Sequence, residues 1–202
     1  DRVQFGKPIG EFQLIQLKLA KMEVARMNLQ NIIFRQIEMS GTGVAMDLAE
    51  ASACKLYSAQ AAMEVAYSEL LLGGVTSIAD LSGAFPGWAD LAARSGIRAF
   101  LAPGYASSRW HVERPHLLDY KWDEANGRRR FKEALELVDE VGKHPSGRLS
   151  GIVYPAQIDT CTEDLLRDSV AAARDRHVPI TTHAAQSVPE FHEMVRRHGK
   201  TP

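Results

Sequence analysis

The strongest constraint on the fold is an abrupt change of pattern at the pair Gly73 and Gly74. Before that pair, apolar residues recur at helical spacing, and no segment has the signals of a strand. After it, short β-branched runs alternate with helical patterns. A chain of 202 residues can hold one ordinary domain or two small ones. The change of pattern therefore raises the question of whether the chain is one protein or two.

Two long helices are predicted before the glycine pair. The first opens near Pro8 and ends before the segment 40–44; from Phe12 onward its apolar residues recur at helical spacing with Gln, Lys, Arg and Glu between them. Asp47 can cap the second helix, which continues without Pro or Gly until Gly73 and Gly74 stop it. Its Ala-rich face allows close packing of helices. The first part is thus predicted to be a long helical hairpin.

Strands that alternate with helices are predicted after the pair. The strands are expected at 75–80, 97–103, 149–156 and 178–185, and the helices near 87–95, 125–143, 162–176 and 188–199. Continuous apolar strands with helical crossovers predict an α/β fold of about four parallel βα units. This number is too small for a complete (β/α)₈ barrel, so the pattern fits either a small open sheet or part of a barrel. The connection 104–124 is predicted to be a long, functional loop.

Composition narrows the classes of partner. With 24 Lys and Arg against 25 Asp and Glu, the net charge of −1 gives no electrostatic reason to expect a nucleic acid or an anionic membrane. Cys54 and Cys161 lack metal-type spacing and imply no disulfide framework, so a cytoplasmic location is expected. No apolar run is long enough to span a bilayer. Unpaired strand edges predict a homo-oligomer, or self-association through the helices and the open edges of the sheet.

Candidate site residues lie where the predicted strands end, because active sites of parallel α/β proteins form at the carboxyl ends of the strands. They are Asp80, Tyr105, Tyr154, Gln157, His183 and Gln186. His183 ends an apolar strand and could bind a metal or move a proton; the alternative is a histidine hydrogen-bonded to a neighbour. Trp110 in the long connection is a further candidate. The flanking His111 and His116 are either a metal pair or part of a solvated loop anchored by that tryptophan.

The first part resembles the C-terminal helical domain of flavin-dependent acyl-CoA dehydrogenases. The pattern Arg-x-x-Phe-Gly-Lys-Pro at the start of the chain and the helix before Tyr67 carry the likeness, over residues 1–68. The resemblance implies that Arg2, Gln4 and Phe5 contact the FAD of a neighbouring subunit. Leu70 stands where the family has Gln, and the segment with the family's catalytic glutamate is absent. This part is therefore expected to be inactive as a dehydrogenase.

The second part, residues 69–202, resembles the metal-dependent amidohydrolases, in the branch of chlorohydrolases and cytosine-deaminase-like enzymes. The segments 69–80, 95–103 and 179–202 carry the likeness. It implies a partial (β/α)₈ barrel, a divalent metal such as zinc or iron, and a small-molecule substrate. His183 corresponds to the metal-ligand histidine of the fifth strand. The family's other ligands would lie upstream of residue 69 and beyond Pro202, and Gln186 replaces its usual glutamate, which an amide cannot match as an acid or base.

Three hypotheses for function follow. The first is a hydrolase of non-peptide C–N or C–Cl bonds by family, incomplete and inactive as given, with Gln186, Tyr154, Gln157 and Trp110 on the substrate side. The second is a fragment of a flavin-dependent oxidoreductase acting on CH–CH bonds. The third is a non-catalytic binding or scaffold module. Flavin absorbance, stoichiometric metal, or cofactor-free cooperative unfolding would distinguish the three.

Overall fold

The structure is a computed structural model that describes residues 3–43, 48–114 and 117–202. The chain forms two compact units, which are described separately. One consists of residues 1–76 with 85–95, and the other of residues 77–84 with 96–202. The helix that follows the first strand of the second part thus belongs to the helical unit.

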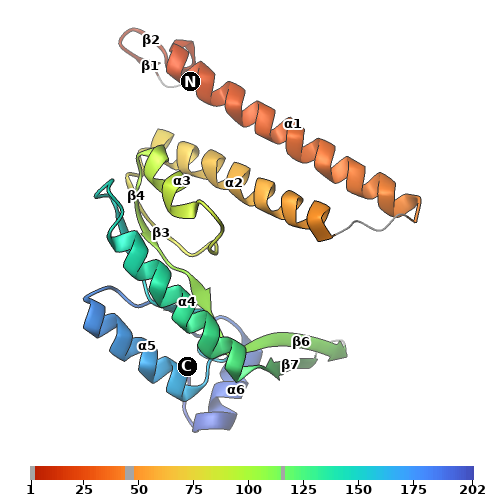
Figure 1. Cartoon of the computed structure of the whole chain (residues 1–202), viewed down its shortest axis with the longest axis vertical. Helices are drawn as coiled ribbons and strands as arrows, with labels where there is room; N and C mark the ends of the chain where they lie inside the picture. Colours follow the sequence, from red (N-terminus) through yellow and green to blue (C-terminus); the bar gives the residue numbers. More distant parts are fainter. Residues whose placement is uncertain (1–2, 44–47, 115–116) are drawn as a thin grey trace. The chain divides into compact units, whose positions relative to one another are not determined.

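The helical unit contains the predicted helical hairpin (Figure 1). Its described elements are the short antiparallel strands β1 (Val3–Gln4) and β2 (Lys7–Pro8), the 3₁₀ turn η1 (Ile9–Glu11), and the helices α1 (Gln13–Gly41), α2 (Leu48–Leu72) and α3 (Trp88–Ser95). Asp47, the predicted cap of α2, lies outside the described residues. Buried Trp88 donates its Nε1–H to the hydroxyl of buried Tyr67 at 3.1 Å, which ties α3 to α2.

The glycine pair ends α2 as predicted, and the hydrogen bonds show how. The N–H of Val75 donates to the carbonyl of Leu70 at 2.8 Å, and the N–H of Gly74 donates to the carbonyl of Leu71 at 3.1 Å. Gly74 has a φ of 87°, in the left-handed region that favours glycine. This is a Schellman motif, which satisfies the last carbonyls of the helix within the helix itself.

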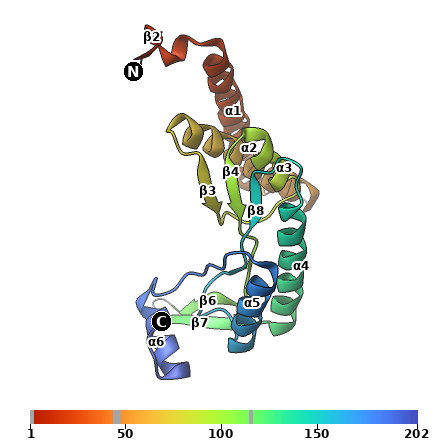
Figure 2. The same ribbon diagram turned by 90° about the vertical axis from the view of Figure 1, so that its left-hand side faces the viewer.

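The second unit is an α/β unit with parallel strand pairs. β3 (Ser77–Asp80), β4 (Arg98–Leu101) and β8 (Leu149–Gly151) pair in that order in a parallel sheet (Figure 2). β5 (Gly104–Tyr105) and β9 (Tyr154–Pro155) continue the pairing of the same two chain segments. The predicted strands 97–103 and 149–156 are therefore each divided into short pieces.

The prediction of a regular strand at 178–185 is wrong. This segment makes two isolated parallel bridges, Val153 with Ile180 and Gln157 with His183. Pro179 has no N–H to donate and contributes its carbonyl, which accepts from the N–H of Val153 at 3.0 Å. The segment still lies parallel to its neighbour, but too few ladder bonds form for a strand.

The prediction of a long loop at 104–124 is also wrong. Its central part is an antiparallel hairpin of β6 (Ser108–Arg114) and β7 (Leu117–Trp122), with Trp110 opposite Tyr120. Trp110 and Val112 of β6, like Tyr120 and Trp122 of β7, recur at a period of two, which favours strands, and cross-strand pairs such as Trp110 with Tyr120 stabilise a hairpin. His111 lies in β6, whereas His116 is outside the described residues, so the structure tests no pairing between them.

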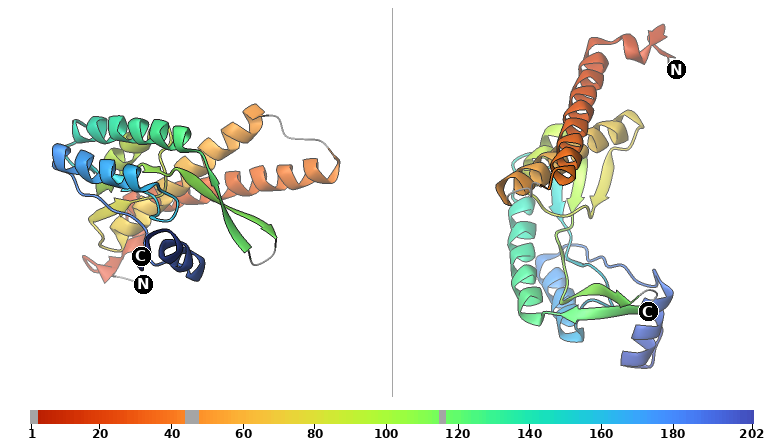
Figure 3. Two further views of the ribbon diagram at one scale, coloured as in Figure 1. Left: turned by 90° about the horizontal axis from the view of Figure 1, so that it is seen from below. Right: turned by 90° about the vertical axis from the view of Figure 1, so that its right-hand side faces the viewer.

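The described helices of the second unit are α4 (Glu124–Gly142), α5 (Glu163–Arg176) and α6 (Val188–His198). α4 and α5 lie side by side (Figures 1 and 3). A Cβ atom on Gly151 of β8 would lie 2.6 Å from Cγ1 of Val138, so glycine lets α4 approach the sheet closely. The core between α4, α5 and the strands contains Tyr105, Ala134, Val153, Cys161, Leu165 and Ala173.

Candidate functional site

The carboxyl ends of the parallel segments bring together three of the predicted residues. The N–H of His183 donates to the carbonyl of Ala156 at 3.1 Å, and the carbonyl of His183 accepts from Ile158 at 3.2 Å. His183 is thereby opposite Gln157. Its ring meets the ring of Tyr154 edge-on, with centroids 5.8 Å apart. An exposed imidazole at this position can accept a proton or coordinate a metal.

Tyr154 is the buried partner in this group. Burial raises the pKa of its hydroxyl, because the phenolate would be poorly solvated. The hydroxyl therefore remains neutral near pH 7 and can donate a hydrogen bond. Gln157 is half-buried, and its side-chain oxygen accepts from the hydroxyl of Thr160 at 3.4 Å. Together with His183, these residues offer hydrogen-bond donors and acceptors. The imidazole of His183 is the one basic group among these three side chains.

The turn after His183 is held by a buried carboxylate. Glu190 is fully buried, and its two oxygens accept from the N–H of Ala185 at 2.8 Å and of Gln186 at 2.7 Å. Ala185 has a φ of 57°, which costs free energy for a residue with a side chain. The carboxylate offsets that cost and fixes the backbone of Gln186, whose side chain is exposed. Ser187 caps α6 by accepting from the N–H of Glu190 at 3.3 Å.

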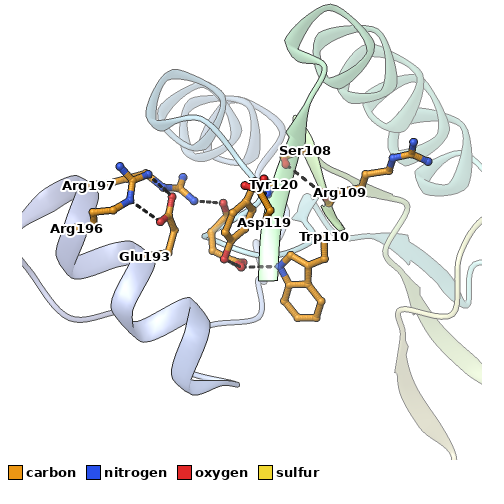
Figure 4. A network of polar contacts seen from close by, with 9 residues as sticks. Ser108, Arg109, Trp110, Asp119, Tyr120, Glu193, Arg196 and Arg197 are labelled. Carbon is orange, nitrogen blue, oxygen red and sulfur yellow. Dashed lines mark hydrogen bonds and ion pairs between the residues drawn. The ribbon is translucent and has the colours of Figure 1, made fainter. Parts of the chain in front are cut away.

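Beside this turn, Asp159 joins the hairpin to the loop after β9. Figure 4 shows the hairpin residues Trp110 and Tyr120 together with Glu193, Arg196 and Arg197 of α6. The Oδ2 atom of Asp159 accepts from Trp110 Nε1 at 2.7 Å and from the Tyr120 hydroxyl at 2.8 Å. Asp159 is 0% exposed, and its Oδ1 has no hydrogen-bond partner among the described residues. The predicted candidate Trp110 is thus positioned by a buried acid. The carboxylate holds both strands of the hairpin at one point.

Arg197 of α6 completes this network. Its guanidinium lies over the rings of Trp122 and Tyr120, at 4.9 and 5.4 Å from their centroids, and it also donates to the carbonyl of Asp159. Glu193 accepts from Arg197 Nε at 2.7 Å. The hydrogen bond from Arg196 and the one from Arg197 lower the pKa of Glu193. Burial and the hydrogen bond to Asp159 raise the pKa of Tyr120, so that its hydroxyl stays a donor.

The residues expected to contact FAD belong to the helical unit. Phe5 lies in the turn between β1 and β2 with a φ of 51°, is 94% exposed, and packs edge-on against Phe12 with ring centroids 6.4 Å apart. Gln4 is in β1, and Arg2 lies outside the described residues. The structure thus leaves the aromatic face of Phe5 open to solvent.

Among the described residues, the metal-ligating side chains near His183 are fewer than a metal centre needs. Catalytic zinc sites take three protein ligands, and His183 offers one. In the ranges 3–43, 48–114 and 117–202, no three His, Cys, Asp or Glu side chains converge in a way that could hold an ion. The described residues therefore do not fit a metal centre by themselves. In the same ranges we find no helix with the length and apolarity that crossing a bilayer requires.

Asp159, Tyr120, Glu190 and Arg197 were not predicted. Glu190 has a local signal, because Ser187 and Glu190 form the Ser-x-x-Glu capping pattern at the start of a helix. Asp159 and Tyr120 have none, since their hydrogen bond joins residues that are 39 positions apart. Arg197 resembles any other arginine on the polar face of a final helix.

Comparison with known proteins gives a different relative for each part. Residues 1–90 match the family described as acyl-CoA dehydrogenase, C-terminal domain. A 5-methylthioadenosine/S-adenosylhomocysteine deaminase of Natronomonas pharaonis is 31% identical over 134 residues, which are 66% of this chain and 28% of that protein. The corresponding enzyme of Halobacterium salinarum is 28% identical over the same length. The chain therefore spans 28% of the length of these curated relatives.

Solved structures of two deaminases share the fold of about two thirds of this chain or slightly more. The adenosine deaminase of Xanthomonas campestris, solved with bound zinc, has a TM-score of 0.52 at 19% identity, over 72% of this chain and 30% of that one. The guanine deaminase of C. acetobutylicum, solved with bound guanine, has a TM-score of 0.53 at 16% identity, over 67% and 31%. The first part of this chain is thus similar to the acyl-CoA dehydrogenase C-terminal domain, and the rest is similar to the amidohydrolase and deaminase superfamily.

Proposed function

We propose that residues 69–202 are an amidohydrolase-type segment, from a hydrolase of non-peptide C–N or C–Cl bonds in small molecules. The observation that carries this proposal is the position of His183. It ends a parallel segment, faces Gln157 across the bridge and contacts Tyr154. The segment's partial-barrel architecture is part of the proposal, supported by the parallel order of β3, β4 and β8 and by the similar deaminase folds.

The boundary near residue 69 is likewise proposed. The curated deaminases align over 134 residues, which is also the number of residues in 69–202. The family match of the first part extends to residue 90, so the two likenesses overlap around β3. A chain that carries pieces of two families is the simplest arrangement that accounts for both.

In this proposal His183 would supply one ligand to a zinc or iron ion, and the other candidates would line the substrate side. A bound divalent metal would supply hydroxide at neutral pH. Tyr154 donates a hydrogen bond from a neutral hydroxyl, and Gln157 and Trp110 orient the substrate. Gln186 has an amide, which cannot exchange protons as a carboxylic acid does. Because His183 is a single donor, we propose that these 202 residues alone do not catalyse hydrolysis.

Zinc titration of the full chain by calorimetry tests the role of His183. We expect weak binding that His183→Ala reduces, while His192→Ala, an exposed histidine on α6, leaves it unchanged. Equal binding by wild type and His183→Ala would refute the ligand role. Tight stoichiometric zinc, together with hydrolysis of an aminopurine by the purified chain, would refute the proposed incompleteness.

A flavin-linked origin is the second candidate function. The family match at residues 1–90 and the solvent-exposed ring of Phe5 favour it. Arg2, Gln4 and Phe5 would then contact FAD, with the arginine paired to the pyrophosphate. Quenching of FAD fluorescence by the chain, lost in Arg2→Ala, supports this candidate. Absence of quenching, with no metal bound either, leaves the non-catalytic binding or scaffold module.

A further inference from the structure

Helix α1 carries two apolar stripes rather than one. The first contains Met22, Ala25, Leu29 and Ile32, which are half-buried at spacings of three and four residues. Met22 and Ala25 lie across a cavity from Ala61 and Val65 of α2. This stripe is the face that α1 packs against α2, as expected for one half of a helical hairpin.

The second stripe consists of Leu17, Ala20, Val24, Met27, Asn31 and Phe34. Its spacings are three, four, three, four and three residues, and all six residues are exposed. The exposed fractions of the large members are 54% for Leu17, 57% for Val24, 51% for Met27 and 64% for Phe34. A single surface helix normally keeps one apolar face, so a second one marks a surface that binds something.

The spacing of the second stripe identifies the shape of its partner. Residues spaced alternately three and four apart lie on one narrow face of a helix. This is the spacing with which two helices pack in a left-handed coiled coil. The N-terminal end of the second stripe lines a groove of about 770 Å³. Leu17, Ala20 and Val24 form one wall, and Tyr57 and Ala61 of α2 lie opposite. The surface therefore fits another helix along α1.

We propose that the second stripe binds the second stripe of another copy of this chain, in parallel. In heptad terms Leu17, Val24 and Asn31 occupy positions a, and Ala20, Met27 and Phe34 occupy positions d. A single Asn at position a specifies register and a two-stranded state, because the two amides hydrogen-bond across the axis. Parallel pairing places Asn31 against Asn31 of the second copy, whereas antiparallel pairing would set it against Ala20.

Charges beside the seam are compatible with this pairing. In a parallel pair, Gln16 faces Lys21 of the second copy, Glu23 faces Asn28, and Gln30 faces Arg35. None of these three pairs places like charges together. Self-pairing therefore has no electrostatic penalty along the seam.

The area is sufficient for a weak dimer. Large side chains that are a little over half exposed each lose on the order of 100 Å² to water when covered. The four large residues of the stripe then give about 400 Å² per copy, and the small and flanking residues bring the pair near the roughly 1,200 Å² at which specific interfaces begin. Dissociation in the micromolar range is the expectation.

Sedimentation velocity of the full chain across the micromolar range tests the proposal. We expect a monomer–dimer equilibrium that Val24→Glu weakens at least about tenfold. The matched control is Ile33→Glu, which changes an apolar residue of the same helix that is 53% exposed but lies outside both stripes. It should leave the equilibrium unchanged. Circular dichroism of each variant checks that α1 and α2 remain folded.

An Asn31→Cys variant tests the register independently. It should form an intermolecular disulfide under mild oxidation, above the level given by the native Cys54 and Cys161. A chain that stays monomeric at all concentrations would overturn the proposal, as would a dimer that Ile33→Glu weakens and Val24→Glu does not. A dimer without the Asn31→Cys crosslink would overturn the parallel pairing. Binding of the stripe to anionic vesicles by a monomeric chain would assign it to a lipid surface instead.

Discussion

Replacement of Asp159 should show how much its hydrogen bonds to the β6–β7 hairpin contribute to the free energy of unfolding. Asp159→Ala removes the acceptor of two hydrogen bonds, from Trp110 Nε1 at 2.7 Å and from the Tyr120 hydroxyl at 2.8 Å. Hydrogen bonds to charged groups contribute about 1.5–3 kcal/mol each. Trp110 is 39% exposed, and its indole N–H can hydrogen-bond to water when the carboxylate is removed. The free energy lost with this hydrogen bond should therefore lie at the low end of that range. We expect a destabilisation of about 3–4.5 kcal/mol.

Asp159→Asn separates the acceptor from the charge. The amide oxygen can take the place of Oδ2 and keep both donors, while the NH₂ group replaces Oδ1, which has no partner among the described residues. The variant loses charge-assisted strength and buries an NH₂ group that has no acceptor among the described residues, but it no longer buries a carboxylate. We therefore expect a loss of about 1–2 kcal/mol, below that of Asp159→Ala.

Urea unfolding followed by circular dichroism measures both losses, and hydrogen exchange of residues 108–122 reports on the hairpin. Asp175→Ala, at an exposed position of α5, is the control and should change stability by less than about 0.5 kcal/mol. Equal losses for the alanine and asparagine variants would refute this reasoning. So would unchanged exchange protection of the hairpin in Asp159→Ala.

Two further predictions concern the core. Gly151→Ala should cost about 1–3 kcal/mol, because its Cβ would lie 2.6 Å from Cγ1 of Val138 and 2.9 Å from Cα of that residue; wild-type stability in urea would contradict the close approach of α4. Tyr105→Phe removes a buried hydrogen bond of 2.7 Å to Ser169 and should cost about 1 kcal/mol at pH 7. Burial raises the pKa of Tyr105, so the folded state retains a proton that the unfolded state loses above about pH 10. Wild-type stability should therefore fall as pH rises past 10, and less steeply in Tyr105→Phe; equal slopes would exclude this tyrosine as the source.

The helices could be predicted from the sequence because their signals are local. Gly73 and Gly74 end α2, and Thr162 and Ser187 cap α5 and α6 with their own hydroxyls. Apolar spacing within each helix adds to these stop and start signals. The predicted limits of α3, α4, α5 and α6 agree with the structure to within one residue.

The hairpin and its anchor could not be predicted in the same way. The length of residues 104–124 predicts a loop, although Trp110, Val112 and Tyr120 follow a period of two that favours strands. The Trp110–Asp159 hydrogen bond joins positions 49 residues apart, and nothing near Asp159 in the sequence distinguishes it from an exposed acid. Tertiary packing decides such a contact, and it also decides that 178–185 forms bridges instead of a strand.

The end of α2 also has a consequence for the evolution and engineering of the chain. Its final hydrogen bonds close on Leu70 and Leu71, and none of them requires a residue after Val75. The helix therefore terminates in the same way whatever sequence comes next, provided that Gly74 keeps its left-handed backbone. Such a self-sufficient stop is a natural joint at which unrelated segments can be exchanged. Residues 74–76 are accordingly the place at which we would cut the chain or attach a different domain.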